Sequence, residues 1–191
     1  MLDFLALMTI ILWPIIPLFW IPVHGLSRII KKIGLLTYVT PLLTWLPLAY
    51  IIYRNRTFVL QFKVDLSVIL NITGISLLVL GTLLHVWAGQ LLGLWGLVGL
   101  PEVSTNIKGK LITRGPFAVV RHPTYFAHIL MFSSIFLITG VIAIGIITLL
   151  DFLLVYTIIT PLEERELLNR FGEEYRLYKK RVPKFFPRVH F

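Results

Sequence analysis

The sequence predicts an all-α polytopic membrane protein with five transmembrane helices and a helical C-terminal tail in the cytoplasm. Of its 191 residues, 57% are hydrophobic and only 14% are charged, whereas a soluble domain typically carries about 25% charged residues. The apolar residues fall in uncharged stretches of roughly 20 residues, which is the length that a membrane-crossing helix needs. The 18 Lys and Arg residues are unevenly placed between these stretches. Together these observations exclude a water-soluble globule.

Residues 4–23 form the first predicted span, because they carry no charge and are long enough to cross a hydrocarbon layer about 30 Å thick. Pro14, Pro17 and Pro22 predict that this helix is kinked or broken. No basic segment precedes the stretch and no small-residue cleavage site follows it, so we expect a retained span and not a signal peptide.

Residues 33–53 and 66–88 predict the second and third spans. The first two spans make an N-terminal unit, residues 1–65, and the remainder, residues 66–191, makes a second unit. After the third span, residues 89–100 are apolar but carry four glycines. We expect this segment to be a poor continuous helix, re-entrant or interfacial.

Residues 123–162 are long enough for two crossings, and Gly140 lies where a tight turn would separate them. The single formal charge in this predicted hairpin is Asp151. A charge within lipid is costly unless it is neutralised or paired. We therefore expect Asp151 to be protonated, or hydrogen-bonded to a Ser, Thr or His of another helix.

The basic residues predict the orientation of the five helices. Fifteen of the 18 Lys and Arg residues fall on the side of the C-terminal tail, and three fall on the other side, Arg54, Arg56 and Lys63. The positive-inside rule then places the tail in the cytoplasm and the N-terminus outside. The net charge of +9 indicates contact with membrane lipids and not with nucleic acid.

The C-terminal tail is the one long polar segment, and it predicts an amphipathic helix. Its apolar residues recur at spacings of three and four, as on one helix face: Leu168, Phe171, Tyr175, Tyr178 and Val182. One interpretation is a helix that lies on the lipid head groups. Gly172 interrupts the pattern and predicts a bend.

The polar residues that could bind a ligand or take part in catalysis are expected on the cytoplasmic side. His122-Pro123 predicts the start of the fourth helix, which places Arg121, His122 and Tyr125 at its N-terminus, where anions are favoured. The hairpin brings Glu163 to the same membrane face, so we expect one interfacial pocket. The chain has no cysteine, no metal-ligand spacing and no glycine-rich dinucleotide motif, so we expect no metal site.

Two histidines in the predicted spans accompany this cluster. His85 lies four residues before Gly89 and is expected near the cytoplasmic surface, and His128 lies beyond His122-Pro123 and is expected to face the pocket. Ionisable residues within a membrane are functional candidates by default.

Three motifs occur in order: Arg-His-Pro-x-Tyr at 121–125, Glu-Glu at 163–164 after an apolar hairpin, and Phe-Gly-Glu-Glu-Tyr-x-x-Tyr-x-x-x-Val at 171–182. In this combination the sequence resembles the isoprenylcysteine carboxyl methyltransferases and the wider group that includes phospholipid N-methyltransferases. The resemblance covers about residues 102–187. It implies an integral-membrane methyltransferase that uses S-adenosyl-L-methionine bound in the C-terminal half, which would make residues 66–191 the catalytic part.

The resemblance also implies which residues form the site. The residues that it assigns to cofactor binding are Lys110, Leu111, Ile112, Phe117, His122, Pro123, Thr124, Tyr125 and Glu163. The predicted catalytic residues are Glu163, Glu164 and Arg121. The chemistry is compatible, since an apolar wall suits the adenine, a carboxylate suits the amino group, and a helix N-terminus suits the α-carboxylate.

The acceptor implied by the resemblance is a lipid, or a prenylated small molecule or protein, with methylation of a prenylcysteine carboxylate as the first expectation. The eukaryotic carboxyl methyltransferases carry an arginine one helical turn before the glutamate, and this chain has Ile159 there. Methylation of a phospholipid amine is the alternative. A nicotinamide-dependent membrane reductase of the sterol reductase type is a further alternative, because such reductases carry a related C-terminal segment.

Overall fold

A computed structural model describes residues 1–107 and 109–186, and the described chain is helical. Its N-terminal elements are α1 (Leu2–Leu12), α2 (Ile15–Gly25), α3 (Ser27–Ile33), the 3₁₀ helix η1 (Gly34–Tyr38), α4 (Val39–Arg54) and α5 (Arg56–Gln61). The predicted break in the first span is confirmed, because α1 ends before Pro14 and α2 begins after it. Lys108 and Arg188, two of the basic residues counted above, lie outside the described residues.

The C-terminal elements are α6 (Val68–Leu97), α7 (Leu100–Val103), α8 (Pro116–Val119), α9 (Pro123–Thr139), α10 (Ile142–Leu154), the π-helix η2 (Val155–Ile159), α11 (Thr160–Phe171) and α12 (Glu173–Arg181). The prediction that segment 89–100 is a poor continuous helix is confirmed. The segment continues α6 through Gly89 and leaves helical geometry at Gly93, which has φ 70° and ψ 167°. Its re-entrant or interfacial placement stays a prediction.

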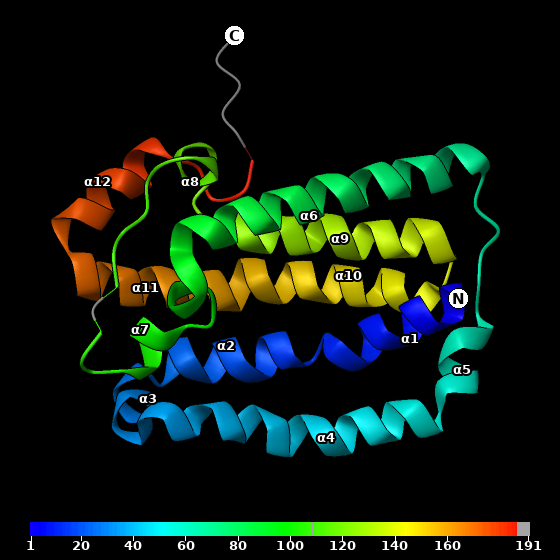
Figure 1. Ribbon diagram of the computed structural model, residues 1–191, viewed down its shortest axis with the longest axis horizontal. Helices are drawn as coiled ribbons and strands as arrows, with labels where there is room; N and C mark the ends of the chain where they lie inside the picture. The colour runs from blue at the N-terminus through cyan, green and yellow to red at the C-terminus, as the bar shows by residue number, and fades with distance from the viewer. Residues whose placement is uncertain (108, 187–191) are drawn as a thin grey trace, which may run out of the picture.

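The long helices lie side by side in an elongated bundle (Figure 1), with α3, α7, α8 and α12 at one end and α5 with the N-terminus at the other. The close packing of α6 on α9 depends on two glycines. A Cβ atom at Gly74 would lie 2.9 Å from the Cβ of Leu137, and one at Gly81 would lie 2.9 Å from the Cγ of Met131. Larger residues at these positions would push the two helices apart.

The hairpin predicted for 123–162 is confirmed, with Gly140 in the left-handed conformation (φ 66°) after α9. Its second arm runs without interruption over Ile142–Phe171. Within the described residues, four helical stretches are long and apolar enough to cross a membrane: Leu2–Gly25, Ser27–Arg54, Val68–Val103 and Ile142–Phe171. The remaining predicted span is α9, which is apolar but only 17 residues long.

The C-terminal tail bends at Gly172 as predicted, where φ is +57°, and α12 folds back toward the chain. The apolar stripe of this tail packs on protein and not on lipid head groups. Tyr175, Tyr178 and Val182 are buried and contact Leu111 and Leu168, among others. The spacing of apolar residues in the tail therefore reflects a helix face that is buried against the protein.

Asp151 is buried and its Oδ1 accepts a hydrogen bond of 2.9 Å from Nε1 of Trp13. The expected Ser, Thr or His partner was wrong, because the N–H that reaches this carboxyl group belongs to an indole, whereas the alternative, a protonated Asp151, stays a prediction. This contact ties α10 to the junction between α1 and α2.

Candidate active site

A cavity of about 500 Å³ lies at the polar end of the bundle, within the range of about 300–1,000 Å³ typical of small-molecule sites. Its walls come from α2, α6, α7, the segment 109–125, α9, α11 and α12. Of the nine residues predicted to bind the cofactor, eight line it: Lys110, Leu111, Ile112, Phe117, His122, Thr124, Tyr125 and Glu163. The ninth, Pro123, is buried at the first turn of α9 and does not line the cavity.

The three predicted catalytic residues have different surroundings. Glu163 and Arg121 line the cavity, whereas Glu164 does not, and its carboxylate faces Lys179 as well as Arg121. Consecutive residues of a helix point about 100° apart, so the Glu-Glu pair cannot turn both carboxylates into one cavity.

Local backbone geometry places the Arg-His-Pro-x-Tyr segment. Gly115 has φ +60° and approaches Leu91 so closely that a Cβ would lie 2.8 Å from its Cδ1. The segment then turns through α8 and extends at Val120. The tail after α12 holds it in place, because the N–H of Arg121 donates to the carbonyl of Pro183 at 2.8 Å. His122 is thereby fixed at the start of α9.

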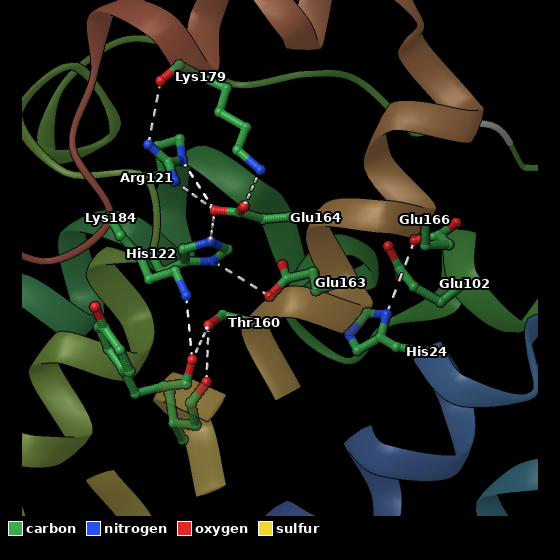
Figure 2. A network of polar contacts seen from close by, with 12 residues as sticks. His24, Glu102, Arg121, His122, Thr160, Glu163, Glu164, Glu166, Lys179 and Lys184 are labelled. Atoms are coloured by element: carbon green, nitrogen blue, oxygen red, sulfur yellow. Dashed lines mark hydrogen bonds and ion pairs between the residues drawn. The ribbon is translucent and has the colours of Figure 1, made fainter. Parts of the chain in front are cut away.

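His122 lies between the two glutamates of the second motif (Figure 2). Its Nδ1 is 3.2 Å from Oε2 of Glu163, and its Nε2 is 3.1 Å from Oε1 of Glu164. Burial by itself lowers the pKa of His122, but the two adjacent carboxylates outweigh this and hold the pKa above its usual value of 6.5. Each ring nitrogen therefore faces a protein carboxylate, with an ion pair to Glu163 and a hydrogen bond to Glu164.

Arg121 completes this arrangement on the outer side. Its Nε and Nη2 donate to Oε1 of Glu164 at 3.0 and 2.6 Å, and its Nη1 donates to the carbonyls of Lys179 and Val182. Lys179 Nζ lies 2.6 Å from Oε2 of Glu164. We call these five residues the motif network: Arg121, His122, Glu163, Glu164 and Lys179.

A second group of ion pairs, which we call the interhelix network, consists of His24, Lys31, Glu102, Glu166 and Arg170. Arg170 Nη2 is 2.6 Å from Oε1 of Glu102 and 3.0 Å from Oε2 of Glu166. Glu166 also lies 3.8 Å from Nζ of Lys31 and 3.9 Å from Nδ1 of His24. This network joins α2, α3, α7 and α11. Figure 2 shows three of its members, His24, Glu102 and Glu166.

Sequence reasoning missed the part of the cavity that comes from the first span. Trp20 and His24 of α2 line the cavity with their rings stacked, the centroids 5.2 Å apart. Glu102 and Tyr175 also line it, and each has a buried oxygen, Oε2 and the hydroxyl respectively, that has no hydrogen-bond partner among the described residues. The available signal was His24 itself, an ionisable residue at the end of an apolar span.

The family of the chain follows from its match to known sequences. A family model for phospholipid methyltransferases matches residues 69–174, which is more than half of the chain. The chain belongs to the phospholipid methyltransferase family. The part that matches the family runs from α6 into α12. It contains every residue of the motif network except Lys179.

Three proteins show individual similarity. The chain is 30% identical over 114 residues to a cobalt-zinc-cadmium resistance protein of Cupriavidus metallidurans, covering 54% of this chain and 52% of that protein. It is 32% identical over 87 residues to a nickel-cobalt-cadmium resistance protein of Alcaligenes xylosoxydans, covering 46% and 40%. It is 34% identical over 98 residues to methanethiol S-methyltransferase 1 of Bradyrhizobium diazoefficiens, covering 48% and 33%. The chain thus spans about half the length of these relatives or less.

Proposed function

We propose that this member of the phospholipid methyltransferase family is an integral-membrane methyltransferase that uses S-adenosyl-L-methionine and acts on a lipid-borne acceptor. The observation that carries the proposal is the cavity, which gathers eight of the nine predicted cofactor residues. A family match alone does not assign an activity, whereas a cavity with a matching donor set adds a chemical reason.

The residues around the cavity fit the three chemical parts of the cofactor. Leu111, Ile112 and Phe117 form an apolar wall suited to an adenine ring. The N-terminus of α9, at Thr124, favours a carboxylate. Glu163 supplies a carboxylate for the amino group, and the unpartnered oxygens of Glu102 and Tyr175 suit hydroxyl groups such as those of a ribose.

Within this proposal, His122 acts by positioning Glu163. Both of its ring nitrogens already face Glu163 and Glu164, so it has no N–H left for a cofactor carboxylate. Glu164 and Arg121 then act through His122, because Arg121 fixes Glu164 and Glu164 fixes the imidazole. We therefore assign direct contact with the cofactor to Glu163, and positioning roles to Glu164 and Arg121.

The cofactor, when bound, supplies an activated methyl group, so the protein mainly has to align the acceptor and exclude water. Methylation of a prenylcysteine carboxylate would call for a cation to hold that carboxylate. Ile159, at the expected arginine position, is buried against Tyr125, Val155 and Phe185. This favours acceptors other than a carboxylate, which include the phospholipid amine.

We also propose that α9 crosses the membrane as the fourth of five helices and that the cavity faces the cytoplasm. The support is the ribbon arrangement, in which α3, α7, α8 and α12 share one end of the bundle (Figure 1). The segments with most of the basic residues lie at that end, as the positive-inside rule requires of a cytoplasmic face.

Calorimetric titration of the detergent-solubilised protein with S-adenosylhomocysteine tests the proposal. We expect a saturable heat for the wild type and an affinity about 10–100-fold lower for Glu163→Gln, since hydrogen bonds to charged groups contribute about 1.5–3 kcal/mol. Glu173→Gln is the matched control, because Glu173 is exposed on α12 and pairs only with Arg176 among described residues. No saturable heat from folded wild type, or binding of a nicotinamide dinucleotide in its place, would contradict the proposal.

A further inference from the structure

Two histidines face each other at the α6–α9 interface, outside both ion-pair networks. His85 of α6 and His128 of α9 line the cavity, and their rings are stacked with centroids 4.9 Å apart. The Nδ1 atom of each ring is buried and has no hydrogen-bond partner among the described residues. A buried histidine nitrogen without a partner is costly, so this pair requires an explanation.

The surroundings of the pair favour a neutral ligand. The rings adjacent to His128 are those of Tyr125 and Phe132, and further apolar wall comes from Leu91. The carboxylates of the cavity each face a partner, Glu102 facing Arg170 and Glu163 facing His122. Of the basic side chains that line the cavity, Arg121 pairs with Glu164, Arg170 pairs with Glu102, and Lys110 is exposed. A charged acceptor next to the histidines would therefore meet no buried counter-charge that lacks a partner, among the described residues that line the cavity.

Building on the proposed function, we propose that His85 and His128 form the acceptor subsite and that the acceptor is a thiol, whose proton the histidine pair removes. Methylation of an uncharged thiol or hydroxyl group must release its proton, which a neutral imidazole can accept. A thiol, with an unperturbed pKa of about 8.5, gives up that proton far more readily than an alcohol. A thiol also crosses apolar surroundings without the cost of carrying a charge.

The step balances within the cavity. A neutral imidazole of the pair takes the S–H proton, and the thiolate sulfur forms a bond to the methyl carbon. The bond between that carbon and the sulfonium sulfur breaks, and its electron pair stays on the sulfur of S-adenosylhomocysteine. The products are a methyl thioether, S-adenosylhomocysteine and an imidazolium, which returns its proton to water. No oxidant, reductant or metal ion is needed.

The test compares two thiols in the wild type and in the double variant His85→Gln, His128→Gln, which keeps polar side chains but removes the bases. For an alkyl thiol, protonated at the assay pH, we expect kcat/KM to fall about 10²–10⁴-fold, the usual contribution of a general base. For an aryl thiol, ionised at the same pH, we expect a loss below about tenfold. Gln90→Ala, at an exposed position of α6 outside the cavity, should change neither value.

A second measurement needs no methyl donor. At a pH below its own pKa, a chromogenic aryl thiol should develop thiolate absorbance when it binds the wild type, and should not do so with the double variant. Where the double variant does not fold, each single Gln variant is measured in its place.

The outcomes separate this inference from the proposed function. Equal losses for the two thiols, no loss at all, or a wild type that binds S-adenosylhomocysteine but methylates no thiol would overturn the thiol subsite alone. Absence of S-adenosylhomocysteine binding to the folded wild type would overturn the proposed function instead.

Discussion

The motif network and the interhelix network both depend on α11, yet they join different parts of the molecule. The motif network uses Glu163 and Glu164 to hold the Arg-His-Pro segment and α12. The interhelix network uses Glu166 and Arg170 to hold α2, α3 and α7. One network thus fixes the side of the cavity formed by sequence motifs, and the other fixes the side formed by the first span.

The two networks also differ in how they meet the cavity. In the motif network a single histidine connects the cavity-facing Glu163 to the outward-facing Glu164, so a change outside the cavity is transmitted to it. In the interhelix network Glu166 does not line the cavity, whereas its partner Arg170 does. We therefore expect damage to the first network to affect binding more than equal damage to the second.

The largest effect is expected for Arg121→Met. This change removes the guanidinium that bonds Glu164 and two carbonyls, and leaves Glu164 buried with fewer partners. Breaking a buried ion pair on one side typically costs about 3–5 kcal/mol. Thermal or denaturant unfolding in detergent measures the loss, and S-adenosylhomocysteine affinity should fall with it. A loss under about 1 kcal/mol would show that the motif network is not a stabilising unit.

Arg170→Met is the matching change in the interhelix network. It leaves Glu102 and Glu166 close together without their shared cation, and we expect a destabilisation of about 3 kcal/mol, softened by Lys31 near Glu166. At equal loss of stability, its S-adenosylhomocysteine affinity should fall less than that of Arg121→Met. A larger fall in affinity would reverse the comparison between the two networks.

These two networks show what the sequence could and could not predict. Arg121, His122, Glu163 and Glu164 stand in two short motifs, and a hairpin with its turn at Gly140 necessarily returns them to one face. The bend at Gly172 and the start of α9 at Pro123 could likewise be predicted, because a single residue determines each of them. Helix geometry predicts that Glu163 and Glu164 point in different directions. The sequence does not predict that His122 lies between the two carboxylates.

The interhelix network was not predictable in the same way, because its residues come from four helices whose packing no local pattern specifies. Glu102 is distant in sequence from Arg170, and His24 from Glu166, so each pair meets only through the packing of α2, α7 and α11. The Trp13–Asp151 hydrogen bond has the same character. The break of segment 89–100 at Gly93 was, in contrast, a local signal, because glycine readily adopts the positive φ found there.

A smaller effect on stability depends on pH and is expected for the motif network alone, because it arises from His122. Because its pKa is raised in the folded protein, its contribution to stability is complete below pH 6.5 and is lost as the pH rises through the raised value. We therefore expect the free energy of unfolding to decrease as the pH rises above 6.5. Unfolding temperatures measured from pH 6 upward should decline, with the slope reduced in His122→Gln and kept in Arg170→Met. An unchanged slope in His122→Gln would refute this assignment.

The smallest effects are expected for the lysines at the edge of each network. Lys179 and Lys31 retain 43% and 33% exposure, and exposed ion pairs typically contribute about 0–1 kcal/mol. Lys179→Met and Lys31→Met should therefore shift the unfolding free energy by no more than about 1 kcal/mol. High salt should reduce both effects further, and a shift above about 2 kcal/mol in either would mean that the lysine is an integral partner.

The central claim is that the cavity between the segment 109–125 and helices α11 and α12 holds S-adenosyl-L-methionine. Ultraviolet cross-linking of the radiolabelled cofactor to the solubilised protein, followed by peptide mapping, tests this location directly. We predict label on peptides that contain residues 109–125 or 163–178, and its loss when excess S-adenosylhomocysteine competes. Competed label on α4 or α5, at a distance from every wall of the cavity, would contradict the account.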